Sequence, residues 1–143
     1  MKRGPAPRRV LVFGTFDLLH AGHRSFLRQA RGLGGELIVA IGRDRIVQKL
    51  KGRRPVHTEI RRQKLVEMLP IVGLAILAPR DPRRRFDFIR RLKPHTIALG
   101  YDQTHYTERL ADDLKRRGLR IRLVRLRPYR AKRYKTSLLR QNV

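Results

Sequence analysis

The fold of this chain is decided by the stretch Gly14-Thr15-Phe16-Asp17-Leu18-Leu19-His20-Ala21-Gly22-His23. An apolar run over residues 10–13 precedes it and apolar residues at helical spacing follow it, which predicts a turn from a first buried strand into a first helix. A helix start leaves backbone N–H groups unpaired and carries the positive end of the helix dipole, so this turn is suited to bind an anion. Gly14 and Gly22 lack a Cβ and let a phosphate approach the backbone.

Two histidines lie in this turn. If the helix begins near His20, the imidazoles of His20 and His23 project from one face and place two donors beside the anion, and Asp17 is expected to orient one of them. A zinc site is the alternative for a His-x-x-His pair, but a structural zinc ion takes four nitrogen or sulfur ligands and the chain has no cysteine. The sequence therefore predicts no metal held by the protein itself.

Length and composition bound the class of protein. With 143 residues, 41% of them hydrophobic, residues 1–143 suit a single domain. No apolar run approaches the roughly 20 residues of a membrane helix, and the apolar stretch after the basic segment 1–9 is too short for a signal peptide. We therefore expect no membrane partner and a location in the cytoplasm. The lack of cysteine excludes disulfides and thiolate catalysis.

The net charge of +25 makes nucleic acid the first rival partner, because a basic surface releases counterions from phosphate backbones. The basic residues are spread over every expected element and form neither one stripe nor a detachable tail. Aromatic residues make up only 6%, with no stacking platform of alternating aromatic and basic residues. These observations disfavour nucleic acid, and a positive field would also concentrate and steer small anionic substrates.

Strands and helices are expected to alternate with short connections. The expected strands are 9–14, 36–41, 73–78, 95–100 and 119–126, the last at an edge with one face exposed. The expected helices are 21–33, 58–69, one from 81 or 82, and 104–117, with a short helix or loop at 45–50 and a short helix from Thr136. The inward stripe of 58–69 is expected to be Leu65, Met68 and Leu69.

This alternation predicts an α/β fold, a Rossmann-like three-layer sandwich with a five-stranded parallel sheet. In such sheets ligands bind beyond the carboxyl ends of the strands, where the strand order reverses. The turns after Gly14, Gly42 and Gly100 and the end of the fifth strand all lie at carboxyl ends. They are therefore expected to converge on one pocket.

Polar residues follow several of these strands. Lys51 follows the second strand and is placed to neutralise the charge of a bound phosphate, with a solvated basic loop as the alternative. Asp102, after Gly100, is suited to accept hydrogen bonds from a nucleobase or a ribose, with a helix cap as the alternative. Near the end of the chain, Thr136 and Ser137 offer hydroxyl and N–H groups at a helix start.

The pattern Gly-Thr-Phe-Asp-x-x-His-x-Gly-His of residues 14–23 resembles the nucleotide-binding motif of the cytidylyltransferase-like nucleotidyltransferase superfamily, with every fixed letter present in order. The resemblance implies that a substrate phosphate attacks the α-phosphorus of a nucleoside triphosphate and that pyrophosphate leaves, without a covalent enzyme intermediate. It implies catalytic roles for His20, His23 and Lys51. The residues that it assigns to nucleotide binding are Gly14, Thr15, Phe16, His20, Ala21, Gly22, His23, Gly100, Asp102, Tyr129, Arg133, Thr136 and Ser137.

Two parts of this resemblance leave alternatives open. The segment 133–137 resembles the second motif of the family but lacks its Gly-Ile pair, so Arg127, Arg130 and Arg133 are alternatives for the cation there. In the helix after Thr58, Arg62 falls where the family often has an arginine, and Arg61 lies next to it.

Within the superfamily, nearly the whole chain resembles the archaeal-type FAD synthases, through residues 14–23, 42–53 and 99–103. That resemblance implies transfer of AMP from ATP to FMN, giving FAD and pyrophosphate, with a divalent cation, usually Mg²⁺, bridging the triphosphate oxygens. Such proteins commonly carry cysteines near the second motif, which this chain lacks, and commonly pair, so the sequence permits a homodimer. The alternatives are a CTP-dependent cytidylyltransferase acting on glycerol 3-phosphate or a similar phosphorylated alcohol, and a basic nucleic-acid-binding module.

Overall fold

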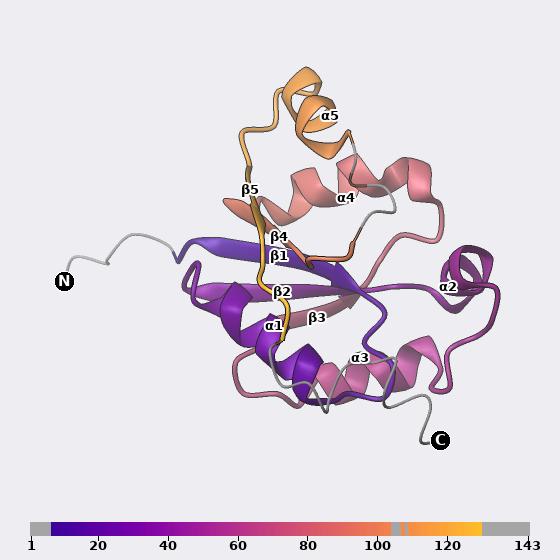
Figure 1. The fold of residues 1–143 in the computed structure, drawn as a ribbon. Coiled ribbons are helices and arrows are strands. Elements are labelled where there is room, and N and C mark those ends of the chain that lie inside the picture. Colours follow the sequence, from indigo (N-terminus) through magenta and orange to yellow (C-terminus); the bar gives the residue numbers. More distant parts are fainter. Residues whose placement is uncertain (1–6, 104–106, 108, 130–143) are drawn as a thin grey trace.

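The computed structural model describes residues 7–103, 107 and 109–129, in which strands and helices alternate along the chain (Figure 1). The strands are β1 (Arg9–Gly14), β2 (Glu36–Ile41), β3 (Leu74–Leu77), β4 (Thr96–Leu99) and β5 (Arg122–Arg125). The helices are α1 (Ala21–Arg31), α2 (Asp44–Lys51), α3 (Glu59–Glu67), α4 (Arg85–Leu92) and α5 (Leu110–Arg116), and the 3-10 turn η1 (Pro82–Arg84) leads into α4.

The five strands form one parallel sheet in the order β3-β2-β1-β4-β5, which confirms the predicted fold class. The chain builds outward from β1 to β3 and then crosses back to β4, so the strand order reverses between β1 and β4. β1 pairs with β2 up to Gly14 opposite Ile41, but its pairing with β4 stops at Val12 opposite Ala98. The two strands therefore part at their carboxyl ends, the usual ligand position in such a sheet.

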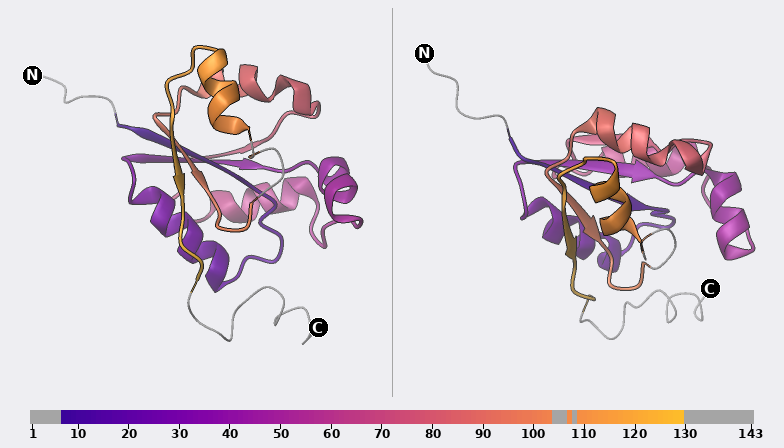
Figure 2. Two further views of the ribbon diagram at one scale, coloured as in Figure 1. Left: turned by 45° about the horizontal axis from the view of Figure 1, so that its top comes forward. Right: turned by 90° about the horizontal axis from the view of Figure 1, so that it is seen from above.

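Helices cover both faces of the sheet (Figures 1 and 2). α1 and α3 pack on one face, and the buried residues joined there include Val10, Val12, Leu37, Val39, Leu27, Ala30 and Val66. α4 and α5 pack on the other face, with Leu11, Ile38, Ile97, Ile89, Leu110 and Leu114. Each buried Val, Leu or Ile side chain stabilises the fold by about 1.5–3 kcal/mol. Because both faces of β1 and β2 are covered, their sequences are continuously apolar rather than alternating.

α2 lies apart from these layers, beyond the carboxyl ends of the strands (Figures 1 and 2). Only Val47 of this helix is buried. Its position is therefore set mainly by polar contacts at its first turn, which are described below.

The bounds of the elements differ from those predicted at several ends. α1 ends at Arg31 and α5 begins at Leu110, so both helices are shorter than expected. β5 is an edge strand as predicted, and the exposed Arg120 and Arg122 lie on the face that was expected to be exposed. Leu123 packs against the cluster under α4 and α5, and Val124 packs against the cluster under α1. The expected exposed face is therefore confirmed at Arg120 and Arg122 but not at Val124.

The expected inward stripe of α3 is partly wrong. The helix ends at Glu67, and the side chain of Met68 is 77% exposed. The buried positions of α3 are instead Arg62 and Val66, which lie one turn apart. An arginine thus occupies the core-facing side of this helix.

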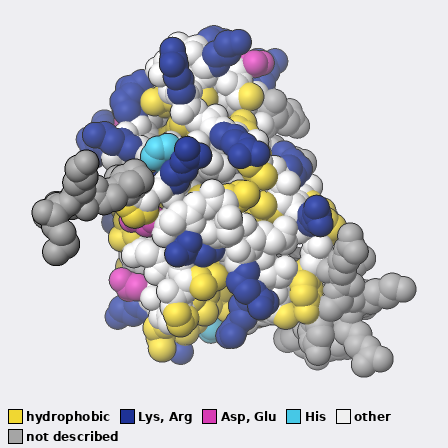
Figure 3. Space-filling model, turned by 90° about the vertical axis from the view of Figure 1, so that its left-hand side faces the viewer, with side chains coloured by type: hydrophobic (Ala, Val, Ile, Leu, Met, Phe, Trp, Pro, Cys, Tyr) yellow, Lys and Arg dark blue, Asp and Glu magenta, His cyan; other side chains and the backbone are white. Residues whose placement is uncertain are grey.

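Charged side chains are scattered over the face of the molecule drawn in Figure 3. Figure 3 shows Lys and Arg side chains distributed over one face of the molecule, interspersed with apolar groups and few acidic ones. Among the described residues, no helix is both long and apolar enough to span a membrane.

Candidate active site

The turn after β1 has an unusual backbone conformation. Phe16 and Leu18 have φ of +54° and +51°, in the left-handed region that residues other than glycine rarely adopt. The Phe16 ring is buried and packs edge-on against His23, with 5.6 Å between ring centroids. Gly42 donates its N–H to the Gly14 carbonyl over 2.9 Å, which joins the ends of β1 and β2. Aromatic packing therefore supports a strained turn next to the histidines.

Gly14 is required by the position of the Phe16 ring. A Cβ at residue 14 would lie 2.5 Å from Cε2 of Phe16, so the ring would have to move. We expect Gly14→Ala to lower the free energy of unfolding by about 1–3 kcal/mol, and to lower activity as well because His23 packs on that ring. Urea denaturation would test this against Gly32→Ala, whose Cβ would come no closer than 3.4 Å to Gln29. Equal stability of the two variants would contradict the prediction.

His20 and His23 together cap α1, and the predicted placement of both imidazoles on one helix start is confirmed. His20 is the N-cap residue, and its Nδ1 accepts a hydrogen bond from Gly22 N–H over 3.1 Å. The Nδ1 of His23 accepts from the backbone N–H of His20 over 3.4 Å, which completes a capping box. The rings stack with centroids 3.8 Å apart and planes 22° apart.

Both imidazoles are neutral at neutral pH. Burial lowers the pKa of His20. The pKa of His23 is lowered to about 4, mainly by burial and to a smaller extent by electrostatic repulsion from His20 and Lys51. The carboxylate of Asp17 opposes this shift but does not cancel it. When Nδ1 of a neutral imidazole accepts a hydrogen bond, the proton lies on Nε2. The stacked rings therefore present two Nε2–H donors without mutual charge repulsion.

The low pKa of His23 makes the stability of the fold depend on pH. The unfolded chain protonates this residue as the pH falls below about 6.5, whereas the folded protein does so only near pH 4. Between these values the unfolded state binds more protons, so stability present above pH 6.5 is lost as the pH falls, by about 3 kcal/mol at most. Urea denaturation at pH 7 and pH 5 should show the loss. His23→Gln should remove most of it, and His95→Gln should retain it; equal wild-type stability at both pH values would contradict the prediction.

Lys51 reaches the histidine turn from the last residue of α2. Its Nζ lies 3.1 Å from Oγ1 of Thr15. The helix ends directly after it because Gly52 adopts φ of +78° and donates its N–H to the Gln48 carbonyl. The structure thus brings Lys51 and the predicted residues of the turn together.

Asp17 fastens the segment after α2 across the same turn. Its two carboxylate oxygens accept the backbone N–H groups of Val56, over 2.7 Å, and His57, over 3.0 Å. These bonds differ from the predicted role of orienting a histidine. Asp17 instead fixes the path of the chain between Lys51 and α3.

At the strand-order reversal, a glutamine bridges the ends of β1 and β4. The side-chain oxygen of Gln103 accepts from Gly100 N–H over 2.8 Å, and its nitrogen donates to the Phe13 carbonyl over 2.7 Å. Arg125 of β5 donates to the Gly100 carbonyl over 2.6 Å. Gly100 is therefore brought to the end of β1, and Asp102 lies exposed in the connection next to it. The sequence analysis included Gln103 in the segment after the fourth strand but predicted no role of its own for it.

The predicted residues near the carboxyl terminus are only partly described. After β5, the backbone N–H and carbonyl of Arg127 pair with the side chain of Gln29 over 3.0 and 3.1 Å, which ties this segment to α1. Tyr129 is the last described residue. Outside the described residues lie Arg130, Arg133, Thr136 and Ser137.

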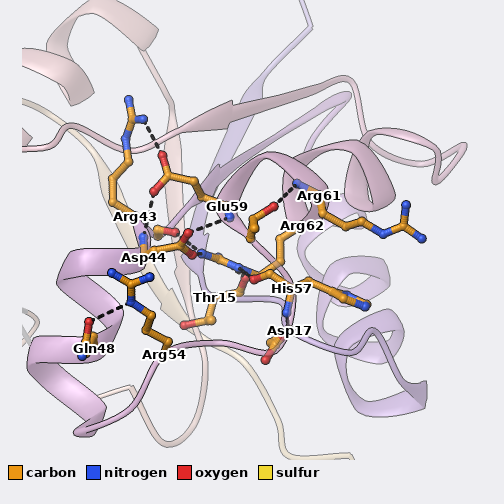
Figure 4. A network of polar contacts seen from close by, with 12 residues as sticks. Thr15, Asp17, Arg43, Asp44, Gln48, Arg54, His57, Glu59, Arg61 and Arg62 are labelled. Carbon is orange, nitrogen blue, oxygen red and sulfur yellow. Dashed lines mark hydrogen bonds and ion pairs between the residues drawn. The ribbon is translucent and has the colours of Figure 1, made fainter.

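Beneath the turn lies a polar network around Arg62, for which the sequence predicted no partners (Figure 4). Arg62 of α3 is fully buried, and its guanidinium donates to the carbonyl oxygens of His57, Thr15 and Gly42 over 3.1, 2.8 and 2.8 Å. It also donates to Oδ1 of Asp44 over 2.7 Å. One side chain thereby joins the ends of β1 and β2 to the starts of α2 and α3.

The first residues of α2 and α3 also cap each other. Glu59 accepts the Asp44 N–H over 2.9 Å, and Asp44 accepts the Glu59 N–H over 3.2 Å. Arg43 donates to Glu59 over 2.8 Å and to the Ala78 carbonyl over 2.8 Å. Burial would raise the pKa of Glu59, but the hydrogen bonds from Asp44 and Arg43 hold that pKa below its ordinary value. α2 is thereby anchored to the sheet by its first turn.

The parallel sheet, with a histidine-capped helix after its central strand, has the architecture that the sequence predicted. The chain belongs to the cytidylyltransferase-like family, whose model matches residues 11–142. It is 40% identical to the FAD synthase of Pyrococcus horikoshii, over 94% of this chain and 91% of that protein. It is 46% identical to the FAD synthase of Methanosarcina mazei, over 82% of this chain and 76% of that protein. Among solved structures, a lipopolysaccharide core biosynthesis protein from Thermoplasma volcanium matches with 32% identity and a TM-score of 0.79, over 87% of this chain and 99% of that one.

Proposed function

We propose that this chain transfers AMP from ATP to FMN, giving FAD and pyrophosphate. The observation that carries the proposal is the stacked pair of neutral imidazoles at the start of α1, with Lys51 held 3.1 Å from Thr15 beside them. Preorganised donors of this kind stabilise charge that grows on phosphate oxygens. Curated relatives named FAD synthase, 36–46% identical to this chain, support FMN as the acceptor and ATP as the donor.

In the proposed reaction, an oxygen of the FMN phosphate attacks the α-phosphorus of ATP in line. A new P–O bond forms, the bond from the α-phosphorus to the bridging oxygen breaks, and pyrophosphate leaves with that electron pair. The attacking phosphate is already largely ionised at neutral pH, so no general base is required. His20 and His23 donate from Nε2 to the phosphate oxygens, and the Lys51 ammonium neutralises part of their charge.

The remaining site residues are proposed to hold the nucleotide. The backbone of Gly14, Thr15, Phe16, Ala21 and Gly22 would lie along the phosphates at the helix start. Gly100 and Asp102 would contact the base or the ribose. The β- and γ-phosphates are assigned to the second motif, which comprises Tyr129, Arg133, Thr136 and Ser137.

We propose that Mg²⁺ enters with ATP as part of the substrate. Among residues 7–103, 107 and 109–129, no three His, Asp or Glu side chains come together as ligands for a metal ion. Mg²⁺ prefers oxygen ligands and commonly keeps substrate phosphates among them, so the triphosphate itself supplies suitable ligands. The cation would neutralise triphosphate charge that Lys51 leaves uncompensated.

The proposal extends to the surroundings of the enzyme. Residues 1–143 would act as one nucleotidyltransferase domain in the cytoplasm, and the net charge of +25 would attract small anionic substrates rather than nucleic acid. The sequence permits a homodimer, which analytical ultracentrifugation would test. Binding of duplex or single-stranded nucleic acid at physiological salt would contradict the proposal that the positive charge serves small anionic substrates.

The experiment that tests the function measures pyrophosphate release by the purified protein with Mg²⁺. ATP and CTP are each combined with FMN and with glycerol 3-phosphate. We expect release only from ATP with FMN, with FAD formed in equal amount. Release only with CTP would move the chain to the cytidylyltransferases, and no release from any of the four mixtures would contradict nucleotidyl transfer to either acceptor.

A further inference from the structure

Arg62 is the only buried charged side chain among the described residues. Burying a guanidinium costs free energy unless all its N–H groups donate hydrogen bonds. An apolar residue of similar volume at such a position often gives equal or higher stability. Here three of its four acceptors are backbone carbonyls from separate parts of the site: the turn after β1, the end of β2 and the segment before α3. This pattern indicates that the arginine fixes geometry rather than only filling space.

The hydrogen bond to Thr15 sets the direction of the next amide. In a trans peptide, the carbonyl of one residue and the N–H of the next point in opposite directions, and the described chain has no cis peptide bond. Because the Thr15 carbonyl accepts from the buried guanidinium (Figure 4), the Phe16 N–H points away from that guanidinium. The positive φ of Phe16 is a conformation that persists only when its surroundings support it. Arg62 provides that support from below.

The hydrogen bond to Asp44 sets the position of Lys51. Asp44 is the first residue of α2 and Lys51 is the last, so a rotation at the first turn would displace the ammonium at the other end. α2 stands beyond the sheet and is anchored by Asp44 and its partner Glu59 (Figures 2 and 4). The same guanidinium therefore sets both the amide of the turn and the helix that brings the lysine.

We propose that Arg62 is a positioning residue for nucleotidyl transfer, which directs the Phe16 N–H and, through Asp44, Lys51 toward the phosphate that the histidines bind. The identity of that phosphate rests on the proposed function. Arg62 itself, being fully buried, does not touch substrate in this arrangement.

The test compares Arg62→Lys with Arg61→Lys, its exposed neighbour on the same helix. Lysine keeps the charge, but its single ammonium cannot reproduce the planar fork that reaches four acceptors. Misplacement of site groups by about 1 Å costs roughly 100-fold in rate, so we expect kcat of Arg62→Lys to fall by about that factor. Calorimetric binding of inorganic tripolyphosphate, which requires no acceptor, should weaken by about tenfold in the same variant. Arg61→Lys should leave both quantities unchanged.

Folding is measured in parallel by circular dichroism and urea denaturation. If Arg62→Lys does not fold, Asp44→Asn replaces it in the test, because asparagine retains the shape and an acceptor but removes the charge. A folded variant with wild-type kcat and wild-type tripolyphosphate affinity would overturn the proposal. Activity lost only in proportion to the unfolded fraction would overturn it as well.

A double-variant cycle tests the connection to Lys51. Residues that act through one another give non-additive effects, so Arg62→Lys should reduce kcat by a smaller factor in a Lys51→Ala background than in the wild type. Equal factors in the two backgrounds would overturn the coupling. A wild-type protein that binds tripolyphosphate but makes no FAD would refute the proposed function, and the binding comparison would still decide the role of Arg62.

Discussion

Replacing His20 or His23 by alanine is expected to lower kcat by about 10²–10³-fold, the usual effect of removing one preorganised donor to a developing oxyanion. The expectation follows from the two stacked rings, whose Nδ1 atoms accept backbone hydrogen bonds and whose Nε2 atoms therefore carry the protons. Pyrophosphate release with ATP, Mg²⁺ and FMN is the measurement. His95→Ala serves as the control, because His95 lies at the amino end of β4, away from the turn.

These variants also remove a helix cap, which has to be separated from the loss of a donor. Asparagine is among the best N-cap residues. The free energy of unfolding of His20→Asn should therefore lie within about 0.5 kcal/mol of the wild-type value. It lacks the Nε2–H, so kcat should fall as far as in His20→Ala. If His20→Asn retained wild-type turnover, the histidine would serve the fold rather than the reaction.

Replacing Lys51 by alanine is expected to lower kcat/KM by about 10–10²-fold, since a hydrogen bond between an ammonium and a phosphate contributes about 1.5–3 kcal/mol. The reason is the position of its Nζ, 3.1 Å from Thr15 in the histidine turn. Lys49→Ala is the matched control, because Lys49 is exposed on the same helix and carries the same charge. The two variants change the net charge of the protein equally.

Salt dependence adds a second readout for this pair. General attraction of ATP by the basic surface is screened as ionic strength rises. If Lys51 acts at the phosphate, the difference between Lys51→Ala and Lys49→Ala should persist at high salt. Similar losses for both variants, vanishing at high salt, would assign the lysine to the solvated basic surface instead.

The parallel sheet and the histidine turn could be predicted from the sequence because local patterns specify them. Continuous apolar runs separated by helical spacing predict buried parallel strands, and the polar pattern of residues 14–23 falls at the first strand-to-helix turn. Lys51 could also be placed, since the carboxyl ends of parallel strands share one edge. The sheet and the histidine turn depend on residues close together in the chain, and the position of Lys51 follows from the topology of the sheet.

The role of Arg62 was harder to recognise because the chain carries many arginines. Arg61, beside it, is the same type of residue. The usable signal was periodicity: Arg62 lies one helical turn before the buried Val66, on the inward face. Asp17 and Gln103 were missed as anchors for another reason. Their partners are backbone groups of segments distant in sequence, and only the folded chain brings those groups within reach.

The central position of β1 has a consequence for folding. β1 is synthesised first, and its partner β2 follows within one helix, so the β1-β2-β3 half can assemble from neighbouring segments. Pairing with β4 instead joins Val10 to Thr96, and contacts between distant segments form late because long loops must close first. We therefore expect pulsed hydrogen exchange to protect β2 before β4. A nascent chain ending before β4 would then contain the histidine turn but would lack Gly100 and Asp102, the residues proposed to contact the base or the ribose.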